Sequence, residues 1–311
     1  MKMRGIALAT CAMLMCLGCG GSATKKNTAE VDVRVKNEVE QLRYFDQVRD
    51  RLVEARLWEL AHRGEIHQML KQVEQRRVPK SAKLQELPEP KAVANLEALA
   101  KPQALDEASH AQLQETFEAY LSCRANYTQE ARELAAYLAA GQYRRDGYKQ
   151  GKELMLRLNE LGQSCQAKEA AVWTQVEGLQ NGVFERMAQD TPLAACYQAL
   201  TQDVTHYKLV IEQMMSYRDG MGELKEAVAG FNALLESVYA HRYLETEALA
   251  KAGMKTLYEV AYAELSQGLR VLKEVIVELN YEGTEPHTVD MKLLPERYAA
   301  INQAYKQFLA E

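Results

Sequence analysis

Apolar residues recur every three or four positions along most of this chain, which is the spacing of one face of an α-helix. In the first long stretch the apolar positions run from Val35 through Phe45 to Ala55. No proline occurs between Asn27 and Val78, and runs of alternating Val, Ile and Thr typical of strands are absent. The pattern therefore predicts an all-α protein that begins with one long helix.

The same spacing and the positions of Gly and Pro set the bounds of the other helices. The first helix has a glycine, Gly64, at which it can bend or break. Long helices joined by short turns favour an elongated antiparallel bundle. The predicted helices are 30–77, a short one over 91–100, then 106–140 or 109–140, 148–189, 191–218, 223–242, 245–280, and a last one that opens near Pro295.

Prolines divide the bundle at one place. Four of the seven prolines fall in residues 78–105, which we interpret as a connector inside a single helical domain covering residues 30–311. A chain of this length can bury a substantial core, and Ala, Leu, Glu, Gln and Lys, all good helix formers, dominate it.

The amino-terminal segment does not follow the helical pattern. Lys2 and Arg4 precede an apolar run, Ile6–Leu17, that contains no charged residue and ends in Gly18 and Cys19. A positive end, an apolar run and small residues at a cleavage point form an export signal. The run is shorter than the ~20 apolar residues that a membrane-spanning helix requires. Residues 1–18 are therefore predicted to be a cleaved signal peptide.

The end of this segment resembles the lipobox of bacterial lipoproteins, in which a small residue precedes an acylated cysteine. Gly18 supplies the small residue before Cys19, although Cys16 stands where that pattern usually has Leu. The resemblance implies that Cys19 carries the lipid and that residues 19–29, which are small and polar, form a flexible tether. In lipoproteins Asp after the cysteine signals inner-membrane retention, so Gly20 implies the outer membrane. The alternative is an ordinary cleaved signal and a free Cys19.

Charge narrows the possible partners. Without Lys2 and Arg4 the chain has 36 basic and 43 acidic residues, a net charge of −7. A mildly acidic surface argues against general binding to nucleic acid. The expected partners are the membrane, through the lipid, and an envelope protein.

Two cysteines of the predicted bundle fall at matching heights on consecutive helices. Cys123 and Cys165 each lie 21 residues from a turn centred near residue 144, and both belong to apolar stripes. Antiparallel helices joined there bring the two side chains to one level, and export makes oxidation possible. The spacing predicts a Cys123–Cys165 disulfide; the alternative is two buried thiols. Cys196 has no evident partner.

Sequence motifs for catalysis or metal binding are weak. Glu59 and His62 have the Glu-x-x-His spacing of di-iron bundles, but that site needs a second such pair, and Asp203 with His206 is only a shorter relative. No Gly-x-Ser-x-Gly elbow, phosphate-binding loop or dinucleotide fingerprint occurs. We therefore expect no metal, no cofactor and no enzyme activity.

Two segments resemble a known family. Residues 141–152, GQYRRDGYKQGK, are similar to the tyrosine-, lysine- and glycine-rich segment of YiiG-like bacterial lipoproteins, and the closing segment from Leu294 through Tyr298 to Tyr305 is similar to that family's last helix. The resemblance covers about residues 105–311, but the paired cysteines usual in the family's first helices are not matched. It implies a helical, lipid-anchored envelope protein carrying a domain of unknown function.

These observations predict a lipid-anchored helical protein of the bacterial envelope that faces the periplasm and acts by binding a partner or supporting an assembly. The alternative is a carrier that holds a small ligand or a metal in a cavity between helices, with the break at residues 219–222 as a hinge.

Overall fold

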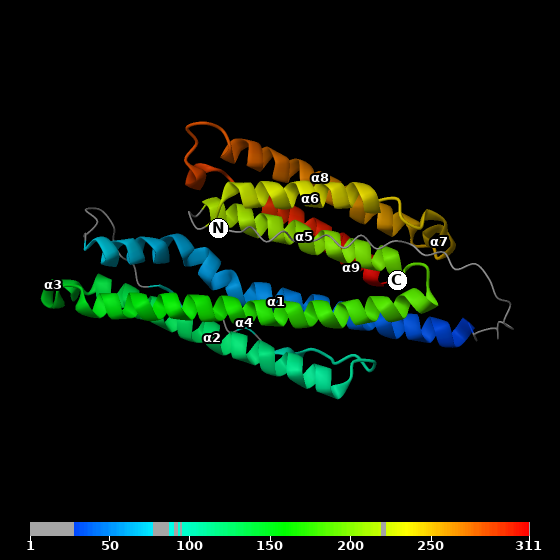
Figure 1. Ribbon diagram of the computed structural model, residues 1–311, viewed down its shortest axis with the longest axis horizontal. Helices are drawn as coiled ribbons and strands as arrows, with labels where there is room; N and C mark the ends of the chain where they lie inside the picture. The colour runs from blue at the N-terminus through cyan, green and yellow to red at the C-terminus, as the bar shows by residue number, and fades with distance from the viewer. Residues whose placement is uncertain (1–27, 77–86, 90–92, 94, 219–221, 311) are drawn as a thin grey trace, which may run out of the picture.

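The computed structural model describes residues 28–76, 87–89, 93, 95–218 and 222–310, which are mostly helical and contain no strand (Figure 1). The predicted all-α class is confirmed. The long helices are α1 (Thr28–Gln75), α2 (Glu107–Ala139), α4 (Lys149–Asp190), α5 (Ala194–Arg218), α6 (Leu224–His241), α8 (Lys255–Leu279) and α9 (Leu293–Ala310). The short ones are α3 (Tyr143–Asp146), α7 (Thr246–Lys251) and the 3-10 turns Leu96–Ala98 and Pro286–Thr288.

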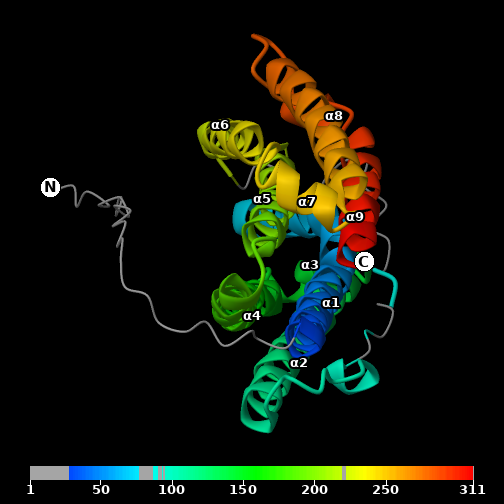
Figure 2. The same ribbon diagram turned by 90° about the vertical axis from the view of Figure 1, so that its right-hand side faces the viewer.

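The helices form two groups along a common long axis (Figures 1 and 2). One group contains α1, α2 and α4, and the other contains α5, α6, α8 and α9. Chain neighbours α2 and α4 run antiparallel, and the four helices of the second group alternate in direction. The predicted elongated antiparallel bundle is therefore present, with one exception: α1 and α2 run in the same direction, and the described residues 95–106 lead to the start of α2.

The connector packs against the bundle at several described positions. Leu87, Leu96 and Leu105 are buried, the first among residues of α1 and α2 at one end and the other two nearer the opposite end. The helix predicted over 91–100 is wrong for the described residues 95–100, which contain only the 3-10 turn. Asn95 begins this turn, since its side chain accepts a hydrogen bond from the Leu96 N–H at 2.7 Å.

Glycine ends α2 as predicted. Gly141 adopts the left-handed conformation at φ 65°, and the next residue, Gln142, donates its N–H back to Tyr137 O at 3.3 Å. This bond and the one from Gly141 N–H to Leu138 O at 3.1 Å form a Schellman motif, which satisfies the last carbonyls of the helix. The predicted turn then contains one helical turn, α3.

The long helix predicted over 245–280 is wrong, because a second Schellman motif divides it into α7 and α8. Gly253 has φ 74° and donates to Ala250 O at 3.1 Å, while Met254 donates to Leu249 O at 2.9 Å. Met254 and Leu249 are both buried, which is the apolar contact that accompanies this cap. The chain therefore turns at residues 252–254 and starts α8 at Lys255.

Buried apolar side chains fall into two clusters. The larger core is formed by α5, α6, α8 and α9 with residues 39–52 of α1, 113–120 of α2 and 172–187 of α4. The smaller core is formed by residues 66–73 of α1, 123–138 of α2 and 154–165 of α4, together with Leu87, Tyr143 and Tyr148. Three helices therefore contribute to both cores and pass from one to the other.

Within the described residues, no helix combines the length and the apolar character needed to cross a bilayer.

Candidate functional site

The predicted lipidation residue, Cys19, lies outside the described residues, as do the signal segment 1–18 and most of the tether 19–29. The first described helix, α1, includes Thr28 and so begins two residues before the predicted start at Glu30. It continues through Gly64 to Gln75 without a break.

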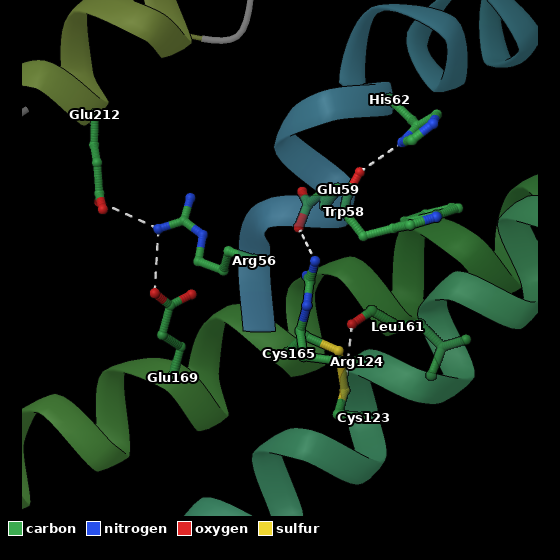
Figure 3. Close-up of polar contacts among 10 residues, drawn as sticks. All are labelled: Arg56, Trp58, Glu59, His62, Cys123, Arg124, Leu161, Cys165, Glu169 and Glu212. Carbon is green, nitrogen blue, oxygen red and sulfur yellow. Dashed lines mark hydrogen bonds and ion pairs between the residues drawn. A yellow bond between two sulfur atoms is a disulfide. The ribbon is translucent and has the colours of Figure 1, made fainter. Parts of the chain in front are cut away.

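Charged side chains separate the two cores, on the three helices that pass between them. Arg56 and Glu59 lie on α1, Arg124 on α2 and Glu169 on α4, and Glu212 of α5 joins them (Figure 3). We refer to these five residues as the charged layer. On α1 and α4 these residues lie between the segments that contribute to the two cores, Arg124 of α2 directly follows Cys123 of the smaller core, and Glu212 contacts Arg56 of α1.

Arg56 links three helices at the centre of this layer. Its Nη1 lies 3.1 Å from Glu169 Oε1 and 3.2 Å from Glu212 Oε2 (Figure 3). Burial lowers the pKa of Arg56, but Glu212 and Glu169 outweigh that effect and shift it upward. Burial raises the pKa of Glu169, because Arg56 only partly offsets the lost hydration and Glu212 adds repulsion. The guanidinium therefore neutralises two carboxylates that face each other.

A second ion pair joins α1 to α2. Arg124 donates to Glu59 across the helix contact, and its guanidinium also lies 5.1 Å from the ring centroid of Tyr127. Glu59 is therefore the ion-pair partner of Arg124. The His62 ring stacks on Trp58 at 4.9 Å, and its Nδ1 lies 2.9 Å from Trp58 O.

The structure joins Cys123 of α2 and Cys165 of α4 in a disulfide beside the charged layer (Figure 3). The two Cα atoms are 5.5 Å apart, within the range that a disulfide spans without distortion. Both residues are buried in the smaller core. The two cysteines lie at the same level of the α2–α4 hairpin, as predicted, because the turn at its tip is formed by residues 141–148. Cys196 is buried as a free thiol in the larger core.

A polar cluster within the larger core contains the residue types of a hydrolase triad. Asp203 of α5 is buried and accepts hydrogen bonds from Tyr262 at 2.9 Å and from Ser237. His241 Nδ1 lies 3.1 Å from Asp203 Oδ2. No sequence pattern predicted this cluster, because its members come from three helices and Asp203 had a sequence partner only in His206.

The geometry of this cluster does not match a nucleophilic triad. In a triad the serine bonds one imidazole nitrogen and the aspartate bonds the other. Here Ser237 Oγ lies 3.2 Å from the same Nδ1 that faces Asp203, and its hydroxyl donates to Asp203. The serine proton is therefore directed at the carboxylate and not at the imidazole. The cluster is best explained as a satisfied buried polar network.

The tip that resembles the YiiG-like segment is a tightly built turn. Asp146 accepts the Tyr137 hydroxyl at 2.8 Å and the Tyr148 N–H at 3.0 Å on one oxygen, and the Gln150 N–H at 3.0 Å on the other. Desolvation raises the pKa of Asp146, but these hydrogen bonds have the larger combined effect, so the pKa is lowered. The carboxylate thus occupies the start of α4, where helix N–H groups favour a negative charge.

Aromatic packing completes the tip. The rings of Tyr143 and Tyr148 stack with centroids 4.9 Å apart. A Cβ added to Gly151 would lie 2.7 Å from the Tyr137 ring, so α2 and α4 approach closely only because this position is glycine. The tyrosine and glycine spacing of the segment is therefore explained by folding of the hairpin.

In the part of the chain that the structure describes, no three His, Cys, Asp or Glu side chains gather as a metal site.

Comparison with known proteins adds the fold. No family model matches the chain, and no curated protein matches it. A crystal structure of an alpha helical protein from Bacteroides fragilis matches 89% of this chain and 98% of its own, with a TM-score of 0.56 and 12% identity.

A crystal structure of an uncharacterized DUF3829-like protein from Bacteroides thetaiotaomicron also covers 89% of this chain and 98% of its own, at 11% identity and a TM-score of 0.45. The chain shares its all-α fold with the Bacteroides fragilis protein. At this identity the likeness concerns the fold alone.

Proposed function

We propose that this chain is a lipid-anchored, non-enzymatic helical protein of the bacterial envelope, which binds an envelope protein partner or supports an assembly. The observation that carries the proposal is the lipobox-like end of residues 1–19, and the internal chemistry of the bundle supports it. The interior charges described above are engaged with one another, and the Ser237–His241–Asp203 contacts lack the geometry of catalysis.

The distance between lipid and bundle supports a surface-mounted rod. Thr28 lies nine positions after Cys19, and a fully extended chain of that length spans only about 30 Å. α1 has 48 residues and is about 70 Å long. A lipid at Cys19 would hold the start of α1 near the bilayer, and the helices would extend from there into the periplasm, with the outer membrane as the proposed site.

An exposed aromatic surface offers a place for a partner. Tyr239 and Tyr243, at the end of α6 and just after it, are 58% and 70% exposed. The Arg242 guanidinium lies 4.8 Å and 4.5 Å from their ring centroids. Tyrosine and arginine dominate the energetically important positions of protein interfaces. We call these three residues the tyrosine surface and propose that the envelope partner binds there.

Membership of the YiiG-like lipoproteins is part of the proposal. Its support is the sequence of the 141–152 segment, together with the finding that those residues build one compact hairpin tip. This membership supplies no activity.

The anchor is tested by intact mass of the protein purified from membranes. We expect a mass that corresponds to cleavage before Cys19 plus a diacylglycerol and a further acyl chain. Cys19→Ser should move the protein from the membrane fraction to the soluble one. An unmodified mature terminus, or membrane binding that survives Cys19→Ser, would contradict the anchor.

The partner is tested by cross-linking in intact cells. We expect one specific cross-linked envelope protein that disappears in the Tyr239→Ala/Tyr243→Ala variant. The matched control is Tyr281→Ala, since Tyr281 is 73% exposed but lies outside the tyrosine surface. Equal recovery of the partner with the wild-type protein, the double variant and Tyr281→Ala would remove the tyrosine surface from the proposal. Recovery of no specific partner would count against partner binding itself.

A further inference from the structure

A groove of about 260 Å³ lies between α4 and α5, with a side chain of α1 at its floor. Figure 2 shows α4 and α5 side by side, one from each helix group. The groove is lined mainly by polar side chains: Arg49, Gln180, Thr201, Thr205 and His206, with Phe184 as an apolar wall. Neither the charged layer nor the Asp203 cluster accounts for it.

Two hydrogen-bond donors at the floor lack acceptors. Arg49 and Gln180 are only 8% and 3% exposed. One Arg49 Nη donates to Gln180 Oε1, which fixes the two side chains against each other. The Arg49 Nε–H and the Gln180 Nε2–H remain without a hydrogen-bond partner, although both atoms are buried. Native proteins rarely leave buried donors unpaired, because each loses its hydration without replacement.

Arg49 gives the floor a positive charge, and Lys208, which does not line the groove, contacts the same aromatic ring. The Arg49 guanidinium and the Lys208 amine lie 5.8 Å and 4.7 Å from the ring centroid of Trp173. Among the described residues neither cation has a carboxylate at ion-pair distance, whereas Arg56 nearby has two. Burial lowers the pKa of Lys208 to about 8, because its effect is larger than the opposing attraction of Glu212.

Acidic groups near the groove limit the charge that it can accept. Asp46 and Asp50 of α1 face Lys306 of α9, at 3.8 Å and 2.6 Å. Glu177 is exposed at the rim. One negative charge therefore balances the floor, while a dianion would meet repulsion from these carboxylates.

We infer that the α4–α5 groove binds a small organic carboxylate, toward which Arg49 and Gln180 turn their unpaired N–H groups and whose carbon chain lies against Phe184. A carboxylate has the two acceptor atoms and the single charge that the floor lacks. The groove is smaller than the 300–1,000 Å³ typical of drug-sized ligands, so the ligand has only a few carbon atoms. This inference goes beyond the proposed function and depends on neither the lipid anchor nor the tyrosine surface.

The test uses the fluorescence of Trp173 in the full-length protein with Trp58→Phe, which leaves Trp173 as the reporter. The probes are sodium acetate and sodium propionate, titrated at constant ionic strength against sodium chloride and inorganic phosphate. We expect a saturable change with acetate and propionate, with half-saturation on the order of 1 mM or below. Chloride and phosphate should give no saturable change.

Variants locate the binding. Gln180→Met removes one donor and should raise the half-saturation concentration at least about tenfold. Gln202→Met is the matched control, since Gln202 is exposed at the rim of the same groove, and it should leave the value within about twofold. If Gln180→Met does not fold, as judged by circular dichroism, Arg49→Lys keeps the charge, loses the free Nε–H and should show the same weakening.

Three results would overturn the inference. A response that is linear and equal for all four salts would show a non-specific salt effect only. Saturation by phosphate without saturation by the carboxylates would reject the ligand class. Saturation that is unchanged in Gln180→Met and in Arg49→Lys would place the site elsewhere.

Discussion

The two cores of this molecule hold together by different means. The larger core draws apolar side chains from eight α-helices, Leu249 of α7 included, and contains an unpaired buried cysteine, Cys196. The smaller core is built by three helices and carries the Cys123–Cys165 disulfide. A small core buries less apolar surface for each residue that it orders. Disulfides are typical of small domains that bury too little apolar surface. The covalent bond is therefore found where burial contributes least.

The charged layer between the cores has a different consequence. A buried ion pair adds little stability relative to well-packed apolar residues, but loss of one partner leaves a charge uncompensated. Arg56 can satisfy Glu169 and Glu212 only when α1, α4 and α5 are in the observed register. We expect the layer to fix the relative position of the two cores rather than to supply most of the stability.

The largest effect should come from the disulfide. The cysteines are 42 residues apart, and the chain-entropy model assigns such a loop about 4 kcal/mol. The Cys123→Ser/Cys165→Ser variant should lose about that much free energy of unfolding, measured by urea denaturation. Cys196→Ala is the control, and a reducing agent should lower its free energy of unfolding as much as it does in the wild-type protein. A redox-insensitive unfolding curve for the wild-type protein would show that the smaller core does not need the bond.

Removal of the central cation should have the next largest effect. Arg56→Met leaves Glu169 and Glu212 facing each other unpaired, so we expect a loss of about 3 kcal/mol in the same denaturation experiment. Arg51→Met is matched to it, because Arg51 pairs with the half-exposed Glu54 one turn away, and it should cost less than about 1 kcal/mol. Equal losses in the two variants would mean that the charged layer acts as an ordinary surface ion pair.

A buried carboxylate at the edge of the larger core should give a moderate effect of opposite sign. Burial, followed by repulsion from Asp50, raises the pKa of Asp46 to about 6. The folded state thus holds this proton more tightly than the unfolded state, so stability falls as the pH rises from about 4 to about 6. Asp46→Asn should remove that slope and gain about 2 kcal/mol at pH 7.

The control for Asp46 is Asp50→Asn, because Asp50 is more exposed and holds Lys306 at 2.6 Å. It should not stabilise the protein at neutral pH. Urea denaturation of both variants at pH 4 and pH 7 separates the outcomes, and an unchanged pH slope in Asp46→Asn would assign the slope to another group.

The smallest effects compare one glycine from each core. Added Cβ atoms would lie 2.7 Å from the Tyr137 ring at Gly151 and 2.6 Å from the Tyr207 ring at Gly268. Alanine at either position should therefore cost about 1 kcal/mol in thermal unfolding, after its gain in helix propensity. Gly178→Ala is the control, since nothing lies near its added Cβ, and it should stabilise α4 slightly. A gain at all three positions would mean that the helices have room to separate.

Periodicity along one helix was enough to predict most of this fold. The predicted bounds of α2, α4, α6 and α9 lie close to those observed because apolar stripes, caps and prolines are local signals. Gly141 was recognised as a cap, but Gly253 was not, although Lys251 followed by Ala and Gly is a similar signal at the end of α7. The helical repeat continues on both sides of Gly253, so the stripe concealed the break.

The candidate site was much less predictable. Cys123 and Cys165 could be paired because one turn relates their heights on adjacent helices. The partners of Arg56 lie 113 and 156 residues away, and no local pattern specifies such a contact. The same holds for Asp203 and His241, which lie on different helices, α5 and α6. A charged residue inside an apolar stripe, such as Arg56 directly after Ala55, is the only signal that was available.

Hydrogen exchange on the native protein, with the disulfide intact and then reduced, tests the separation of the two cores most directly. We predict that reduction increases exchange in residues 66–73, 123–138 and 154–165, while amides of α5, α8 and α9 keep their protection. An equal loss of protection in both regions would contradict the account, because it would show one cooperative core in place of two.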